Sequence, residues 1–339
     1  MRLADLDYSL PPGLVAQQPL ARRDEARLLV VNRHTKKIEH SHFYKLERHV
    51  RDGDVLVLNE TKVLAARIRA RKASGGRVEL LLVRPVDEPA GGWLALTRGH
   101  RPLKPDSELF LDGGARLRVA GYVRPGRVIV CAGDSQPLEQ MLAEHGELAL
   151  PHYIRRPVAG ADAEQYQTVY AAYPGAIAAP TAGLHFTQEL LTQLADHGIK
   201  AVGLTLHIGP GTFAPIRHDN VECHSMEAER YVIPAATIAA IEHARRVGGR
   251  VIATGTSTVR ALESYAITGR EQGDTGLFIL PGFRFKLVEG MITNFHMPRS
   301  TVLALVMAFG GRELTLAAYQ EAIRRRYRFL SYGDAMLIV

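Results

Sequence analysis

The sequence predicts an α/β protein that carries a second, smaller antiparallel β-domain. Residues 151–339 alternate strand and helix patterns, which favours an α/β fold with a largely parallel sheet. Residues 66–150 hold short alternating runs between Gly and Pro turns spaced roughly 8–12 residues apart, which is typical of a small antiparallel β-domain. A chain of 339 residues suits two domains, or one large domain with an insertion.

The elements follow in order along the chain. The first part begins with a segment rich in Pro, Gln and Arg, and then contains apolar runs at 28–31 and 55–58. In the β-region, pairs of short strands are expected around turns at 74–76 and 125–126. Residues 141–145 are expected to form a short helix that leads back from this region.

Three segments of the second half share one design, in which a β-branched apolar run ends in a loop of Gly, Thr, Ser, Asn or His. They are residues 201–211, 250–264 and 291–309, and a helix pattern usually follows the loop. Ligands bind at the carboxyl ends of strands in open or barrel-like α/β sheets. We therefore expect the functional site at these loops.

Helix starts are marked by hydroxyl side chains. Thr187 is expected to cap one helix, Ser257 or Thr258 a second, and Ser300 a third that spans 301–309 and ends at two glycines. The third helix is apolar on nearly all sides, which predicts burial. Its amino end suits a carboxylate, a phosphate or a polarised ring nitrogen.

Composition excludes several classes of protein. Only two cysteines occur, Cys131 and Cys223, which disfavours a disulfide framework or a structural zinc site. The start lacks the apolar segment of a signal peptide, and no apolar stretch reaches about 18 residues, so we expect a cytoplasmic protein without a membrane span. The net charge of +7 is compatible with nucleic-acid binding but does not select it.

Common cofactor motifs are absent from the sequence. There is no Walker A sequence, no Gly-x-Gly-x-x-Gly and no His-Glu-x-x-His. This argues against P-loop nucleotide hydrolysis, a simple dinucleotide-binding fold and a zincin metalloprotease.

Four side chains near the strand ends can exchange protons, and each has a structural alternative. They are His185, His207, Glu229 and His296. The histidines can equally be satisfied polar groups in turns or in the core, and Glu229 can belong to a solvated charged strand. His224, Glu227 and Glu229 lack the third element of a metal motif, so no metal site is expected.

Further polar residues suit binding. Arg260 can fork onto a carboxylate, or alternatively pair with Glu263 or another acid, while Asn294 can read a heterocycle by hydrogen bonds. Residues 324–337 mix four arginines with Tyr327, Phe329 and Tyr332, a pattern that can hold a nucleic-acid backbone and stack bases. The alternative for this segment is a solvated helix face ahead of a buried last strand.

Eight segments carry distinctive motifs in a fixed order. They are residues 5–31, 53–68, 147–156, 162–187, 204–216, 251–264, 292–309 and 327–338, including the sequences APTAGLHFT, LTLHIGPGTFAPI and ITNFHMPRS. Together they resemble the S-adenosylmethionine:tRNA ribosyltransferase-isomerase family. The resemblance runs almost end to end and is weakest in the β-rich stretch. It implies an irregular barrel-like α/β catalytic domain, formed by 1–65 and 151–339, with an inserted small β-barrel domain at 66–150.

The resemblance also implies a reaction late in queuosine biosynthesis. The ribosyl part of S-adenosylmethionine is transferred and isomerised onto 7-aminomethyl-7-deazaguanine at the wobble position of tRNA. The product is epoxyqueuosine-tRNA, and adenine and methionine are released. S-Adenosylmethionine is thus a consumed co-substrate, and no cofactor is expected. The expected partners are tRNA and S-adenosylmethionine, and the protein is expected to be a monomer.

This chemistry requires a base that removes the acidified C5′ hydrogen, a hydrogen-bond donor to adenine and a base that deprotonates the amine. The four proton-exchanging candidates are expected to supply them. Expected substrate-binding residues are Tyr166, Gln167, Thr181, Gly183, Gly209, Gly211, Thr212, Gly255, Thr256, Ser257, Arg260 and Asn294. Expected tRNA-binding residues are Arg155, Arg156, Arg324, Arg326 and Arg328.

One segment departs from the family pattern His-x-Met-His-Ser-Glu. Here Glu227 replaces the second His and Ala228 replaces Ser, in residues 224–229. If that His were the essential base, Glu227 would have to substitute for it. This departure supports one alternative, a diverged paralogue that uses S-adenosylmethionine on another acceptor. A second alternative, independent of it, is a non-catalytic tRNA-binding protein.

Overall fold

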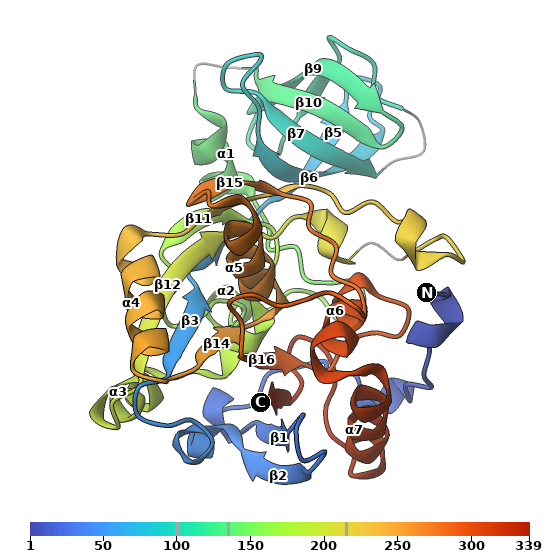
Figure 1. The fold of residues 1–339 in the computed structure, drawn as a ribbon. Helices are drawn as coiled ribbons and strands as arrows, with labels where there is room; N and C mark the ends of the chain where they lie inside the picture. The colour runs from blue at the N-terminus through green and yellow to red at the C-terminus, as the bar shows by residue number, and fades with distance from the viewer. Residues whose placement is uncertain (99–101, 134–135, 214–215) are drawn as a thin grey trace.

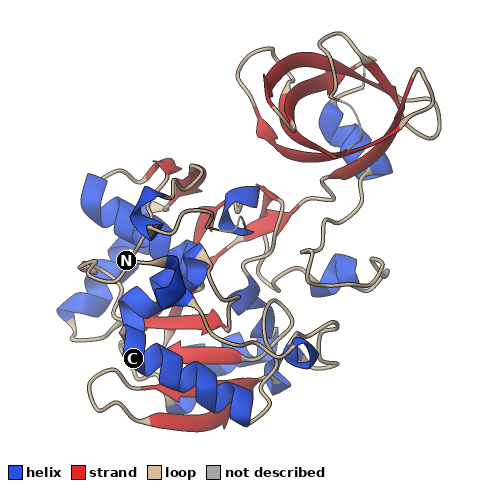
Figure 2. Cartoon of the chain, turned by 90° about the vertical axis from the view of Figure 1, so that its right-hand side faces the viewer, coloured by secondary structure: helices blue, strands red, loops and turns tan. Residues whose placement is uncertain are grey.

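The chain folds into a large α/β domain and a separate β-barrel. The computed structural model describes residues 1–98, 102–133, 136–213 and 216–339. The barrel is at the top of Figure 1, above the larger domain, and Figure 2 shows it standing off to one side. The α/β class with an inserted antiparallel barrel is confirmed.

A nine-stranded sheet forms the centre of the larger domain. Its order is β15 (Gln272–Thr275), β13 (Glu229–Val232), β12 (Lys200–Leu206), β3 (Val55–Asn59), β14 (Val251–Thr254), β16 (Gly290–Asn294), β17 (Ala335–Ile338), β1 (Arg27–Val31) and β2 (Ile38–His42). In β3, Val55 and Val57 pack into one apolar cluster while Leu56 and Leu58 pack into another. The two clusters lie on opposite faces, because side chains alternate along a strand. Burial on both faces explains the uninterrupted apolar runs.

The expectation of a largely parallel sheet is wrong, because the sheet is mixed. The central strands β12, β3, β14 and β16 are parallel, but β16 pairs antiparallel with β17, and Asn294 lies opposite Ala335. Between them, α6 (Thr301–Gly310) and α7 (Arg312–Arg324) bend by 112° and return the chain to the edge that it left. Apolar periodicity identifies strands but does not give their direction.

Helices cover the sheet, and two of the three predicted caps are confirmed. The helices of the larger domain are α2 (Asp162–Gln165), α3 (Gln188–Asp196), α4 (Ala235–Arg246), α5 (Thr256–Thr268), α6 and α7. The hydroxyls of Thr187 and Ser300 accept hydrogen bonds from the N–H groups of Leu190 and Leu303. The cap expected from Ser257 or Thr258 is wrong. Here β14 runs directly into α5 through Gly255, whose φ of +92° is a conformation that glycine adopts without strain.

The barrel is closed, six-stranded and antiparallel throughout. Its order is β10 (Arg127–Ala132), β7 (Trp93–Arg98), β6 (Arg77–Pro85), β5 (Arg67–Lys72), β8 (Glu108–Phe110) and β9 (Arg116–Arg124). The predicted short helix is α1 (Leu138–His145), which packs Met141 and Leu142 into the barrel core. The strands lie inside the predicted insertion of 66–150, whose limits stay a prediction. The chain's single tryptophan, Trp93, belongs to this core.

A parallel pair, β4 (Thr61–Val63) and β11 (Tyr173–Ala176), lies beside the chain segment that leads into the barrel. Within the described part of the chain, no single helix has the length and apolar character to cross a membrane. The bent pair of α6 and α7 meets that test by length and composition only.

Candidate active site

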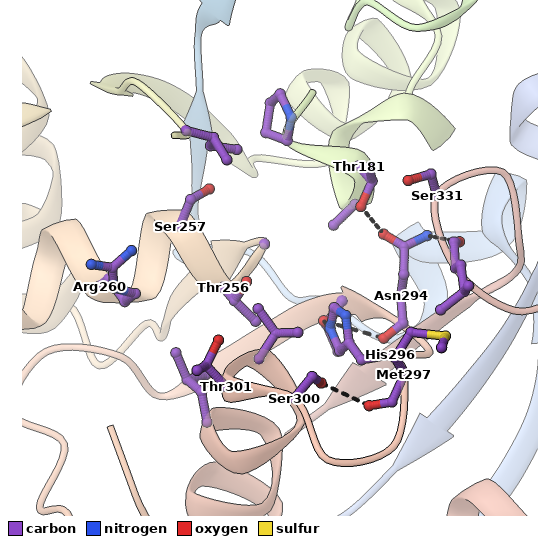
Figure 3. A pocket seen from close by; sticks show the side chains of 18 of the residues that line it. Thr181, Thr256, Ser257, Arg260, Asn294, His296, Met297, Ser300, Thr301 and Ser331 are labelled. Carbon is purple, nitrogen blue, oxygen red and sulfur yellow. Dashed lines mark hydrogen bonds between the residues drawn. The ribbon is translucent and has the colours of Figure 1, made fainter. Parts of the chain in front are cut away.

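A cavity of about 380 Å³ lies where β14 and β16 end. Figure 3 shows hydroxyl, amide and imidazole groups around it. Its polar lining includes Thr181, Thr256, Ser257, Arg260, Thr293, Asn294, His296, Ser300 and Thr301, and its apolar lining includes Ile208, Met226, Leu277, Phe278, Ile279, Met297 and Leu305. All three predicted strand-end loops thus contribute to one cavity. Its size and mostly apolar wall are typical of a small-molecule site.

Two helices begin at this cavity. Residues of the first turns of α5 and α6 line it, among them Thr256, Ser257 and Thr301. The first N–H groups of a helix lack partners within the helix, and the helix dipole makes this end positive. The buried hydroxyl of Thr301 has no hydrogen-bond partner among the described residues. This end of the cavity therefore favours an anionic group or another hydrogen-bond acceptor.

His296 lines the same cavity. Its Nε2 lies 2.7 Å from the hydroxyl of Thr293, and its backbone N–H donates to the hydroxyl of Tyr319 at 3.0 Å. Burial lowers the pKa of His296 to about 4. The ring is therefore neutral at neutral pH and can donate or accept a hydrogen bond through its second nitrogen.

Asn294 connects this cavity to His185. Its Oδ1 accepts a hydrogen bond from the Thr181 hydroxyl at 2.8 Å, and its Nδ2 lies 3.2 Å from Nε2 of His185. His185 is only 4% exposed, and burial lowers its pKa to about 4. His185 thus lies behind Asn294 and does not line the first cavity.

His185 instead lines a second, more polar cavity of about 510 Å³. Its charged lining residues are Arg22, Arg23, Asp24, Glu164 and Glu189, and Ser331 lines both cavities. Asp24 is buried, and its Oδ1 has no hydrogen-bond partner among the residues that the structure describes. A buried carboxylate oxygen without a partner is costly, so a ligand N–H group at this position would be stabilised.

Glu229 and Arg260 form a buried ion pair. Arg260 also donates from Nε to the Leu277 carbonyl and from Nη2 to the Thr275 carbonyl, each at 3.0 Å. Oε1 of Glu229 accepts the Gly209 N–H at 2.7 Å. These contacts favour the ion-pair alternative for Arg260, with Glu229 as its partner instead of Glu263.

Several predicted site residues lie outside both cavities. His207 contacts the Thr61 hydroxyl at 2.9 Å through Nδ1, and burial lowers its pKa. Gln167 bonds the backbone of Val63 at both its amide atoms, and Tyr166 is fully buried in a small apolar cluster. These contacts favour structural roles for all three residues.

Of the four glycines predicted to bind substrate, one lines a cavity and three do not. Gly255 lines the first cavity, whereas Gly183, Gly209 and Gly211 do not. Gly183 packs on Tyr170 so closely that an added Cβ would lie 2.0 Å from its hydroxyl. The side chain of Thr212 lies outside the described residues.

The predicted tRNA-binding arginines are scattered. Arg156 forms a two-pronged ion pair with Asp162 at 2.6 and 2.7 Å, and Arg324 pairs with Glu321. Arg328 donates to a backbone carbonyl, while Arg155 and Arg326 are exposed. The aromatics interleaved with the C-terminal arginines, Tyr327, Phe329 and Tyr332, are all buried. The prediction that bases stack on these aromatics is therefore wrong. The burial favours the alternative, in which the arginines face solvent ahead of a buried last strand.

Other lining residues were not predicted from the sequence. The hydroxyls of Thr293 and Thr301 lie inside the predicted strand-end segments, so the same pattern could have identified them. Residues 277–279 look like ordinary core because they are apolar. Among the described residues, no group of three His, Cys, Asp or Glu side chains is placed to hold a metal ion.

The fold and the cavity together define an α/β protein with a small-molecule site at its strand ends and an inserted barrel. The chain belongs to the queuosine biosynthesis protein family, whose model matches residues 3–338. It is similar to the S-adenosylmethionine:tRNA ribosyltransferase-isomerases of Geobacter metallireducens, at 47% identity, and Thermotoga maritima, at 43%, over the full length of each chain. The crystal structure of the S-adenosylmethionine tRNA ribosyltransferase from Thermotoga maritima matches with a TM-score of 0.57 and 36% identity, and covers 99% of this chain and 100% of that one.

Proposed function

We propose that this protein is an S-adenosylmethionine:tRNA ribosyltransferase-isomerase. It transfers and isomerises the ribosyl moiety of S-adenosylmethionine onto 7-aminomethyl-7-deazaguanine at the tRNA wobble position. The product is epoxyqueuosine-tRNA, with release of adenine and methionine. The family membership supports this activity, and the observation that carries it in the structure is the cavity at the ends of β14 and β16.

The first cavity is the proposed S-adenosylmethionine site. Its wall combines the apolar side chains of Met226, Phe278 and Met297 with the amino ends of α5 and α6. An apolar wall suits the adenine ring and the methylene groups of the methionine chain, and a helix amino end suits the methionine carboxylate. Because Arg260 is already held by Glu229, the helix ends are the proposed carboxylate partners.

The chemistry starts at C5′, where the sulfonium acidifies the neighbouring hydrogen. Removal of that proton gives an ylide-like carbanion, which opens the ribose ring by breaking the C4′–O bond and leaves a C4′=C5′ vinyl sulfonium. The freed oxygen forms an aldehyde at C1′ as the C1′–N bond breaks, and adenine leaves with a proton. The amine adds to C4′ and loses a proton, which restores the carbanion at C5′. This carbanion attacks the C1′ aldehyde to close the carbon ring, and the resulting alkoxide forms the epoxide at C5′ as the C5′–S bond breaks and methionine leaves. No resident cofactor is proposed, since S-adenosylmethionine supplies the transferred carbons.

His296 is the proposed hydrogen-bond partner of the departing adenine. It is the only one of the four proton-exchanging candidates that lines the first cavity, among the described residues. A group whose pKa is about 4 is a weak base at neutral pH, so removal of a carbon-bound proton does not suit it. A neutral imidazole can still hydrogen-bond an adenine ring nitrogen and so assist its departure.

The second cavity is the proposed place of the acceptor base. It shares Ser331 with the first, and the Asn294–His185 contact joins the two walls. Oδ1 of Asp24, which has no hydrogen-bond partner among the described residues, is a buried acceptor of the kind that matches the N–H groups of a deazaguanine. Monomeric state and a cytoplasmic location stay predictions.

The test is adenine release, followed by chromatography, with purified protein, S-adenosylmethionine and tRNA carrying the aminomethyl base. We expect adenine to accumulate only when all three are present. The matched control is tRNA of the same sequence with guanine at the wobble position. A folded protein that binds S-adenosylmethionine but releases no adenine with the modified tRNA would refute the proposed activity.

A further inference from the structure

The carboxylate of Glu227 lies between two arginines of the barrel. Its Oε1 forms ion pairs with Nη2 of Arg127, on β10, and with Nη2 of Arg124, on β9, at 3.3 Å for the latter. Glu227 belongs to the segment just before β13, which runs below the barrel in Figure 1. The contact therefore joins the inserted barrel to the α/β domain.

The barrel hairpin itself creates a need for an acid at this position. Arg124 and Arg127 are register partners across the β9–β10 hairpin. Like charges directly opposite each other destabilise an antiparallel pair, and a carboxylate between them removes that repulsion. Arg127 is only 18% exposed, against 59% for Arg124, so the pair with Arg127 is the less screened of the two.

Glu227 is also close in sequence to the wall of the first cavity. Met226 lines that cavity, and Glu229 pairs with Arg260, which lines it as well. The backbone of Gly211 packs against Glu227, because a Cβ added at Gly211 would lie 2.8 Å from the Cβ of Glu227. The segment 226–229 is thus fixed on three sides: by the barrel, by a strand-end loop and by α5.

We propose that Glu227 is a positioning residue, through which Arg127 and Arg124 of the barrel hold Met226 against the S-adenosylmethionine cavity. This inference rests on the proposed function. It assigns the barrel a part in substrate binding and gives Glu227 no proton transfer, since Glu227 does not line the cavity. It also accounts for a carboxylate where the family resemblance has His, because two guanidinium groups face this position.

The experiment measures binding of S-adenosylmethionine alone, by equilibrium dialysis, and then the kinetics of adenine release. Glu227→Gln keeps the shape and removes the charge, and Arg127→Ala removes the main partner. We expect each to weaken S-adenosylmethionine binding about fivefold, equivalent to about 1 kcal/mol, with kcat changed less than about twofold and its pH profile unaltered. Combining Glu227→Arg with Arg127→Glu should restore binding to within about twofold of the parent.

The matched control is Asp106→Asn, which removes the charge from the 3.2 Å ion pair of Arg118 and Asp106 on the barrel's surface. This control should leave S-adenosylmethionine binding unchanged. The fluorescence of Trp93, in the barrel core, verifies that the barrel stays folded in every variant.

The possible results distinguish a failure of this inference from a failure of the proposed function. Binding by Glu227→Gln equal to the parent would overturn the inference alone. A large loss of kcat together with a lost limb of the pH profile would also overturn it, because Glu227 would then exchange a proton. A parent protein that does not bind S-adenosylmethionine would refute the proposed function, and the inference with it.

Discussion

The burial of His185 predicts a measurable loss of stability in mild acid. Its side chain is 4% exposed, and burial lowers its pKa from 6.5 to about 4. The unfolded chain therefore binds a proton at this residue below about pH 6.5, whereas the folded chain binds it only below about pH 4. The stability contributed by the neutral ring is complete above pH 6.5 and falls as the pH drops toward 4.

The magnitude follows from the two pKa values. Each pH unit in this window costs about 1.4 kcal/mol of unfolding free energy for one histidine, so His185 lowers it by about 2 kcal/mol between pH 7 and pH 4.5. Other groups titrate in the same interval, and a matched variant is needed to isolate this one. His185→Gln keeps an acceptor for the Asn294 amide and has no titratable group.

The assay is urea unfolding followed by circular dichroism at the two pH values, for the parent and for His185→Gln. We expect the parent to lose about 2 kcal/mol more than the variant between pH 7 and pH 4.5. Equal losses in the two proteins would refute the reasoning. His185 would then be as easily protonated in the folded chain as in the unfolded one, and its proposed isolation behind Asn294 would be wrong.

Three further substitutions test the site. Glu229→Gln leaves the buried Arg260 without its partner and should lower the unfolding free energy by about 3–5 kcal/mol, measured by urea titration; a loss below about 1 kcal/mol would contradict a structural ion pair. His296→Gln should lower kcat for adenine release roughly 10²-fold or more while S-adenosylmethionine still binds, and near-normal turnover would return His296 to a structural role. Asp24→Asn should raise KM for tRNA with KM for S-adenosylmethionine unchanged, and the opposite split would place the two substrates the other way round.

The location of the first cavity could be predicted from the sequence, because polar residues that follow a buried strand meet at one edge of a sheet. Gly255, Thr256, Ser257, Asn294 and His296 were found in this way, and all line the first cavity. The caps at Thr187 and Ser300 were predicted because a helix start needs only a local acceptor for its free N–H groups.

Other features depend on contacts between distant segments. The partner of Arg260 is Glu229, 31 residues away, and no local pattern distinguishes it from the nearer Glu263. The second cavity combines a segment near Arg22 with His185 and Ser331, which only the folded chain brings together. Tyr327 and Phe329 are likewise buried, because both rings pack against Phe295 from the segment after β16, and this removes the base-stacking interpretation.

The central claim is that the ribosyl carbons of S-adenosylmethionine end on the tRNA. The most direct measurement uses S-adenosylmethionine labelled either in the ribose or in the methyl group, with tRNA that carries the aminomethyl base, and counts the label in the recovered tRNA. The proposed function predicts transfer of the ribose label, in equal amount to the adenine released, and no transfer of the methyl label. Methyl label on the tRNA, or ribose label that stays in solution, would contradict it.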